Sequence, residues 1–261
     1  MKPAPDKISI DPAPCVINPQ RSRIEPAIDS PALLIPLPGD LERMTRLFRE
    51  AGSQCYKDHS LRVFHFKESK RNMALAGPAV GAPQAVMILE KLIALGAGQV
   101  ILLGWIGGLQ PYLSFGDLLL PDGAFSEEGT SAHYSKEKRP KPSANLFQEL
   151  RKALQKGGVA FRQGPVWTTD APYRETIDKV KTFQSQGLLG VDMETSAVFT
   201  VGAFRGIETA ALLVVSDDLS RLKWRHGFRE PQFKESRNKV IDFLFRFCLP
   251  SRTTGIPEDS I

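Results

Sequence analysis

The stretch VDMETSAVFTVGAFRGIETAALLVVSDD, residues 191–218, shows the local pattern that decides the fold. Its first part is rich in small and apolar residues and predicts a long helix over Val191–Phe204. Its second part is an apolar run that predicts a buried strand over Thr209–Val215, and Ser216 and Asp217 follow that strand directly. A helix that leads within a few residues into a buried strand is typical of α/β proteins.

The same alternation continues toward both ends of the chain. Helices are predicted over Leu41–Ala51, Pro83–Leu95, Ala144–Gln155, Thr176–Gln184 and Phe233–Phe247. Strands are predicted over Leu61–Phe66, Asn72–Ala76, Gln99–Leu103, Asp117–Leu120 and Val159–Trp167, and a short apolar run covers Ala32–Pro36. This order predicts an α/β domain with a mostly parallel or mixed sheet and helices on its faces.

The apolar periodicity stops near both ends of the chain. Residues 1–31 are rich in proline and aperiodic, which predicts an extended arm, a disordered tail, or an arm that packs on a neighbouring subunit. Residues 251–261 form a polar tail. A chain of 261 residues suits one large α/β domain or two small ones, and we expect a single domain over residues 32–250.

The composition argues against several classes of protein. The longest apolar run, Val100–Leu109, is far shorter than the ~20 residues that span a bilayer, so no membrane segment is expected. Three widely spaced cysteines fit free thiols in a reducing compartment, and we expect a cytoplasmic protein. The net charge of +5 is scattered rather than clustered with aromatic residues. This argues against nucleic acid as a partner and leaves room for a basic pocket that binds an anion.

Ligands of such sheets bind beyond the carboxyl ends of the strands. The segments that follow predicted strands are therefore the candidate ligand loops: Pro38–Asp40, Gly104–Gly108, Thr168–Tyr173, Asp192–Glu194 and Ser216–Asp218. The four histidines show no spacing typical of a metal site, so no metal is expected.

Two carboxylates in these loops could serve chemistry on a nucleoside. Glu194 begins a predicted helix, and a carboxylate that accepts two hydrogen bonds suits the adjacent 2′- and 3′-hydroxyls of a ribose. The alternative is an ordinary first-turn glutamate that stabilises the helix dipole. Asp217 follows a buried strand, where a carboxyl group could protonate a leaving purine at N7. The alternative there is a helix cap or an Asx turn.

Two glycine-containing loops could approach a ligand closely. Gly39 precedes a helix with Arg43 in its first turn, and a helix N-terminus with an arginine fork suits an anion. An ordinary strand-to-helix turn is the alternative. The glycines within Gly104–Gly108 would let a ligand lie against the backbone, but they do not form the dinucleotide-binding pattern. A tight turn between strands is the alternative for that loop.

Taken together and in this order, the segments resemble the nucleoside phosphorylase and uridine phosphorylase family over about Leu33–Phe247. Val191–Phe199 is similar to the ExMExxA helix of the family. The other matching segments are Ala79–Ala97 (glycine loop and helix), Gly104–Leu109 with Phe115–Leu118 (GxxGGL…GD), Glu128–Ser131 with Tyr134, and Leu213–Asp217 (strand and catalytic aspartate).

The resemblance implies a three-layer α/β sandwich around a mixed, barrel-like sheet. It implies a nucleoside substrate, inorganic phosphate as co-substrate without another cofactor, and a homo-oligomer that is a dimer, trimer or hexamer. The roles that it implies are phosphate binding for Gly39 and Arg43, ribose binding for Met193 and Glu194, and base binding for Ile106, Gly107 and Tyr173. They also include purine N7 protonation by Asp217, with Arg229 as its helper.

Several positions depart from the family pattern. A phosphate-binding arginine of the family is replaced by Leu102, and the serine or threonine just after the following glycine is replaced by Trp105; Arg62 is a candidate substitute. Pro172 and Tyr173 occupy the region of the base-stacking phenylalanine. Thr176 and Asp178 fall where a uracil-reading Gln-x-Arg pair is expected, which argues against uridine, and the retained Asp217 favours a purine.

Three hypotheses follow from the sequence. The first is a purine-type nucleoside phosphorylase with an altered phosphate site, which releases the free base and ribose 1-phosphate. The second is a nucleoside hydrolase that uses water. The third is a non-catalytic nucleoside-binding protein with the proline-rich arm as a docking element.

Overall fold

A closed ring of strands lies at the centre of the computed structural model, which describes residues 15–29, 31–58, 60–66 and 71–249. The strands are β1 (Ala32–Leu34), β2 (Gln54–Asp58), β3 (Leu61–Phe66), β4 (Arg71–Ala76), β5 (Gln99–Gly108), β6 (Leu118–Ser126), β7 (Arg162–Thr168), β8 (Gly190–Asp192), β9 (Glu208–Asp218) and β10 (Arg225–His226). The helices are α1 (Pro38–Glu50), α2 (Gly81–Ala94), α3 (Ala144–Lys156), α4 (Ile177–Ser185), α5 (Thr195–Arg205) and α6 (Pro231–Cys248), with short 3₁₀ turns η1 (Thr130–His133) and η2 (Pro172–Arg174).

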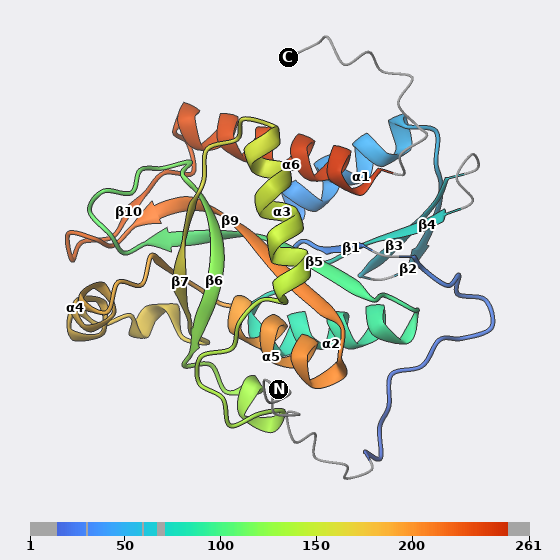
Figure 1. Ribbon diagram of the computed structural model, residues 1–261, viewed down its shortest axis with the longest axis horizontal. Helices are drawn as coiled ribbons and strands as arrows, with labels where there is room; N and C mark the ends of the chain where they lie inside the picture. Colours follow the sequence, from blue (N-terminus) through green and yellow to red (C-terminus); the bar gives the residue numbers. More distant parts are fainter. Residues whose placement is uncertain (1–14, 30, 59, 67–70, 250–261) are drawn as a thin grey trace, which may run out of the picture.

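The sheet closes because the long strand β5 has three neighbours. The strand order is β10-β9-β6-β7-β8-β5-β1-β4-β3-β2, and an additional parallel pairing joins β9 to β5. Strands β5, β9, β6, β7 and β8 therefore form a five-stranded barrel with mixed strand directions, while β1 to β4 extend the sheet on one side (Figure 1). This confirms the expected mixed, barrel-like sheet.

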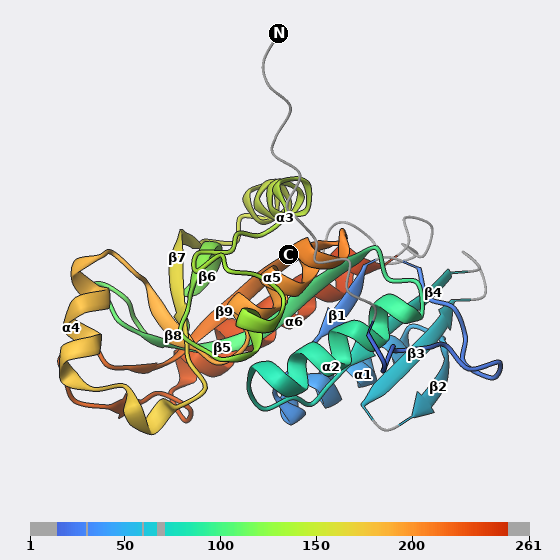
Figure 2. The same cartoon turned by 90° about the horizontal axis from the view of Figure 1, so that it is seen from below.

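Helices cover both faces of this sheet, as the amphipathic patterns predict. One apolar core lies between the sheet and helices α2 and α5, and a second lies between the sheet and helices α1, α3 and α6. Figure 1 shows α1 and α6 above the strands and α2 and α5 below them, and Figure 2 shows the same arrangement from below. Among the described helices, none is long and apolar enough to cross a membrane.

Element boundaries differ from the predicted ones where glycine-containing segments join the barrel. Gly104–Gly108, predicted as a ligand loop, belongs to β5, because it pairs with β9 over its whole length. The helix predicted to begin at Val191 begins at Thr195 instead, since Val191 pairs with both β5 and β7 as part of β8. Strand β2 and the two-residue strand β10 were not predicted from the sequence. Helix α1 begins earlier than predicted, at Pro38.

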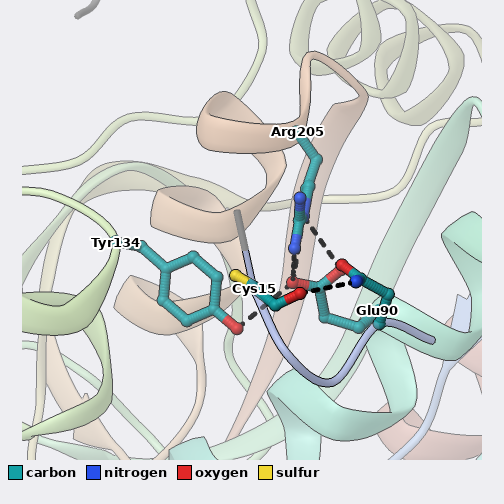
Figure 3. A network of polar contacts seen from close by, with 5 residues as sticks. Cys15, Glu90, Tyr134 and Arg205 are labelled. Atoms are coloured by element: carbon teal, nitrogen blue, oxygen red, sulfur yellow. Dashed lines mark hydrogen bonds and ion pairs between the residues drawn. The ribbon is translucent and has the colours of Figure 1, made fainter. Parts of the chain in front are cut away.

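The described part of the N-terminal arm packs on helix α2 of the same chain. Glu25 forms an ion pair with Lys91, and the backbone N–H of Ile28 donates to the carbonyl of Leu95. The adjacent helix residue Glu90 accepts hydrogen bonds from Arg205 and Tyr134, with the arm residue Cys15 alongside (Figure 3). Residues 1–14 of the arm and the predicted tail 251–261 lie outside the described residues.

Candidate functional site

The candidate residues gather where strands β5, β8 and β9 end. A cavity of about 460 Å³ lies beside the end of β9, between the segment that precedes α4 and the segment that links β9 to β10. It is lined by Pro172, Tyr173, Glu175, Ile177, Val180, Asp217, Leu219, Leu222, Lys223 and Trp224. Its volume falls within the usual range for a small-molecule site. Two sequence-predicted residues, Asp217 and Tyr173, are therefore brought to one cavity.

Asp217 is held in this cavity by two hydrogen bonds. The Ser216 hydroxyl donates to Asp217 Oδ1 at 2.6 Å, and the Trp224 indole N–H donates to Asp217 Oδ2 at 2.9 Å. Burial raises the pKa of Asp217 above its usual range, although both hydrogen bonds oppose this effect. A carboxyl group with a raised pKa in a cavity is suited to donate a proton.

Glu175 is a second acid of the cavity, and sequence reasoning missed it. It lies just after the 3₁₀ turn η2, and in the described part of the chain its carboxylate has neither a hydrogen-bond nor an ion-pair partner. Burial, and secondarily the charge of Asp217, raise the pKa of Glu175 to about 7. Glu175 lies two residues beyond the predicted ligand loop Thr168–Tyr173, and a lone glutamate there resembles any solvated loop residue.

Gly107 lies directly against the predicted acid. A Cβ atom at this position would lie 2.6 Å from Leu219 Cδ1 and 3.0 Å from Asp217 Oδ2. A larger residue here would therefore displace the side chains of Leu219 and Asp217. Ile106 is buried in the core beneath this point, and Tyr173 is fully exposed at the cavity rim. The structure thus places Tyr173 at the cavity and Gly107 against Asp217, and it directs Ile106 into the core.

Met193 and Glu194 link β8 to α5, so Glu194 precedes the helix rather than lying in its first turn. The backbone N–H of Gly81, which begins α2, donates to Glu194 Oε1 at 2.8 Å. A Cβ at Gly81 would contact the Met193 methyl group at 3.6 Å, so both predicted ribose residues meet α2 at its N-terminus. Burial, followed by the nearby charge of Asp192, raises the pKa of Glu194 to about 8.

A buried polar network fixes the backbone of this link. Asp192 accepts hydrogen bonds from the Thr168 hydroxyl at 2.7 Å and from the Thr195 N–H at 2.9 Å. Glu128 accepts from the hydroxyls of Ser126 and Ser196 and from the N–H of Ser131. Burial raises the pKa of Glu128, but these donors outweigh it and lower the pKa overall. The network accounts for the role of the Glu128–Ser131 segment, which holds α5 at its first turn.

The predicted phosphate residues lie on the other side of β5, at the start of α1. The Arg43 guanidinium donates to both carboxylate oxygens of Asp242 in α6, at 2.9 and 3.1 Å. A Cβ at Gly39 would lie 3.8 Å from the Arg237 guanidinium, so another arginine of α6 approaches this glycine. Arg62, the candidate substitute, is buried and lies 3.7 Å from the Glu42 carboxylate.

Trp105 occupies the centre of this side. Its indole N–H donates to Asp40 Oδ2 at 2.7 Å, and Arg237 forms an ion pair with Asp40 Oδ1 at 2.5 Å. Asp40 is completely buried; burial raises its pKa, and Arg237 and Trp105 oppose that effect. Leu102 is fully buried in the core that faces α2 and α5. We call Asp40, Trp105 and Arg237 the Trp105 cluster.

Arg229, the predicted helper of the acid, is exposed just before α6. No hydrogen bond or ion pair joins its side chain to Asp217 in the described residues. The donor that reaches Asp217 from this segment is Trp224. The predicted role of Arg229 as the helper of Asp217 therefore stays a prediction.

Comparison with known families gives a match over nearly the whole described chain. The family model of the phosphorylase superfamily matches residues 32–249. A guanosine phosphorylase of Halorubrum lacusprofundi is 25% identical over 220 residues, covering 83% of this chain and 91% of the relative. A DeoD-type purine nucleoside phosphorylase of Clostridium novyi is 29% identical over 153 residues, which span 57% of this chain and 65% of that relative.

Solved structures agree with this match. A uridine phosphorylase of Vibrio fischeri has a TM-score of 0.73 at 24% identity, with 85% of this chain and 92% of that chain covered, and shares the fold. An AMP nucleosidase of Bacteroides thetaiotaomicron has a TM-score of 0.62 at 27% identity, with 81% and 87% covered.

Proposed function

Because this chain belongs to the phosphorylase superfamily and is an enzyme of the nucleoside phosphorylase family, we propose that it cleaves the N-glycosidic bond of a purine nucleoside with phosphate. The products are the free base and ribose 1-phosphate. The named relatives that act on purine nucleosides support the substrate class, and the guanosine phosphorylase makes guanosine the first substrate to test.

The observation that carries this proposal is the acid at the cavity. Cleavage leaves negative charge on the departing purine, and a proton delivered to N7 neutralises it. Asp217 faces the cavity, and its pKa is raised by burial, so a protonated carboxyl is available closer to neutral pH than for an exposed aspartate. A pyrimidine has no N7, so this acid favours a purine.

Glu175 suits the six-membered ring of the base. Its carboxylate has no partner within the described chain, so its hydrogen-bonding capacity is available to a ligand. A carboxylate accepts two hydrogen bonds in parallel, which matches the N1–H and 2-amino donors of guanine. The two acids of the cavity would then contact opposite sides of one purine.

Met193 and Glu194 suit the ribose. Glu194 Oε1 accepts a hydrogen bond from the Gly81 N–H, and burial together with the charge of Asp192 raises the pKa of Glu194 to about 8. The 2′- and 3′-hydroxyls of a ribose would add two donors. Bound sugar would therefore favour the ionised form of Glu194, and the proton that it carries would be released.

The test is release of free base from a panel of purine and pyrimidine nucleosides, with and without inorganic phosphate. The proposal expects release from purine nucleosides, dependence on phosphate, and ribose 1-phosphate among the products. Release from pyrimidine nucleosides alone would overturn the purine assignment. Binding of nucleosides without any release would favour the non-catalytic alternative.

A second candidate is hydrolysis, and the phosphate side of the site favours it. Arg43, Arg62 and Arg237 each lie beside a carboxylate of the same chain, which compensates part of their positive charge. The Trp105 indole stands where the family has a small hydroxyl residue, and a dianion lacks its usual charged donors. The structural likeness to an AMP nucleosidase is consistent with this candidate. Base release at equal rates with and without phosphate would identify water as the acceptor.

The same side offers a gain-of-function variant. Trp105→Ser would restore the hydroxyl donor of the family pattern, whereas Leu102 is buried in the core that faces α2 and α5 and is left unchanged. If phosphate is the limiting partner, this variant should bind inorganic phosphate more tightly than the parent chain. Isothermal titration with phosphate measures this, and Trp105→Ala serves as a control that opens similar space without a new donor.

A further inference from the structure

The link between β9 and β10 folds back so that Trp224 reaches the acid. Strands β9 and β10 are antiparallel, and His226 lies directly opposite Asp217 in the register. Residues opposite one another share a face of the sheet, and Trp224 shares that face with His226, since it precedes it by two positions. The pairing therefore directs the Trp224 side chain diagonally toward the Asp217 carboxyl group.

A row of aromatic rings holds this side chain in place although 60% of it is exposed. The Trp224 ring lies 5.6 Å from the His226 ring, and the His226 ring stacks on Phe228 at 5.7 Å with planes 10° apart. The ring centroids of Phe228 and Trp105 lie 5.8 Å apart. Such contacts favour one orientation of the indole, and its N–H is directed at Asp217 Oδ2.

We propose that Trp224 is the positioning residue of the acid Asp217, and that its indole N–H stabilises the carboxylate formed when the proton leaves. This rests on the proposed function. Asp217 Oδ1 accepts from Ser216 and Oδ2 accepts from Trp224, so the carboxyl plane is fixed at both oxygens. An Oδ2–H group can accept the indole hydrogen bond and still donate its proton to the purine.

The reaction step balances without another component. The proton passes from Asp217 Oδ2 to N7 of the purine, the C1′–N9 bond breaks, and its electron pair stays on the base. Asp217 becomes a carboxylate and regains a proton from solvent. A hydrogen bond from a neutral N–H is stronger to this carboxylate than to the protonated acid, so Trp224 stabilises the transition state more than the ground state.

Other charged groups also face Asp217 and are unchanged by a substitution at Trp224. Glu175 approaches from the segment before α4, Asp218 is the next residue of β9, and His226 lies across on β10. Lys223 lines the same cavity. These groups are present in both the parent chain and the Trp224 variant, so a difference between the two chains reports the loss of the indole.

The experiment compares Trp224→Phe with the parent chain on two substrates. Guanosine needs a proton at N7, whereas 7-methylguanosine already carries positive charge there and leaves without an acid. We expect kcat/KM for guanosine to fall roughly tenfold, as for the loss of one hydrogen bond to a charged group. We expect the basic limb of its pH profile to move upward by roughly half a unit to one unit, since the carboxylate loses a donor.

7-Methylguanosine and Phe228→Leu are the controls. Turnover of 7-methylguanosine by Trp224→Phe should stay within about twofold of the parent, because no proton transfer to N7 is needed. Phe228→Leu shortens the aromatic row without removing a hydrogen bond, and the basic limb should stay in place. An equal loss on both substrates, or the same pH shift in Phe228→Leu, would show that ring packing rather than the N–H matters.

A titration of Asp217 by carboxyl carbon NMR separates this proposal from the proposed function. The pKa of Asp217 should be higher in Trp224→Phe than in the parent chain, whether or not the chain cleaves guanosine. An unchanged Asp217 pKa would overturn the role of Trp224. Absence of base release in the parent chain, with the pKa difference present, would instead count against the proposed function alone.

Discussion

Charged side chains lie on both sides of strand β5, but their contacts differ. On the side of the cavity, Glu175 has no partner among the described residues and the hydrogen bonds that Asp217 accepts there come from neutral donors, so both carboxyl groups can respond to a ligand. On the phosphate side, Arg43 and Arg237 each form an ion pair with a carboxylate of the chain. The first arrangement leaves carboxyl groups without an opposite charge beside them, and the second pairs each arginine with a carboxylate of the fold.

This difference separates groups that bind from groups that hold the protein together. A buried charge without a partner raises the free energy of the folded state, so such a group persists where a ligand completes it. The buried ion pair of Asp40 and Arg237 lies within the chain itself and joins α1 to α6. A carboxylate beside the cavity is therefore a candidate for ligand binding, whereas the carboxylate of Asp40 is a candidate for stabilising the fold.

The largest expected effect is on the acid itself. Asp217→Asn should lower kcat/KM for guanosine by about 10²–10⁴-fold, the usual range for the loss of a general acid. The amide keeps the acceptor for Trp224 but has no proton of suitable acidity. Steady-state kinetics measure this, with 7-methylguanosine as the matched substrate. Unimpaired guanosine cleavage would show that another group protonates the base.

The next effect concerns the phosphate side and stability. Arg237→Met leaves the buried Asp40 carboxylate without its ion pair and should lower the free energy of unfolding by about 3 kcal/mol. Arg43→Met breaks a more exposed pair, with side chains 26% and 43% exposed, and should cost under about 1 kcal/mol. Denaturant unfolding compares them. Equal costs would mean that the Trp105 cluster is no more structural than the surface pair.

A smaller effect is expected for recognition of the base. Glu175→Gln should raise KM for guanosine by roughly tenfold, since one strong acceptor is weakened. Purine riboside has no N–H donor on its six-membered ring, so its KM should change little. Competition between the two substrates measures the ratio directly. A uniform change in KM would assign Glu175 to the shape of the cavity rather than to hydrogen bonding.

The smallest effect is on the pH dependence of stability. The pKa of Glu175 is raised from 4.5 to about 7 in the folded chain. Between these two pH values the folded state therefore keeps a proton on Glu175 that the unfolded state has lost. Stability due to this group is complete below about pH 4.5 and is lost as the pH rises through 7. Glu175→Gln should therefore be more stable than the parent at pH 8 and equal to it near pH 4; solvent screening of this partly exposed carboxyl reduces the full linkage of about 3 kcal/mol to roughly 1 kcal/mol. Unfolding curves at both pH values test the sign.

Much of the fold followed from local patterns. The helices over Ala144–Lys156 and Ile177–Ser185 nearly coincide with their predicted ranges, because their apolar periodicity and caps are encoded within each segment. Strands β5 and β8 could not be delimited in this way. Their ends are formed by pairing with partners distant in sequence, so glycines that suggest a turn lie inside the barrel.

Some residues of the candidate site follow from local sequence motifs, and others are seen only in the structure. Asp217, Met193 and Glu194 follow from the motif order, and the structure places all three near the ends of barrel strands. Glu175 and Trp224 do not follow from it, because the first is an unremarkable loop glutamate and the second depends on the register of β10 against β9. The predicted contacts of Arg43 and Arg229 with ligand stay predictions.

The sequence by itself determined that this is an α/β chain of the nucleoside phosphorylase type, since periodicity, strand ends and ordered motifs are all local properties. Only the tertiary structure decided which charges are available to a substrate. Whether a carboxylate or an arginine has a partner depends on which helices and strands pack against it. Asp40 and Asp217 look alike in the sequence, yet α6 supplies an arginine to the first and a short hairpin supplies an indole to the second.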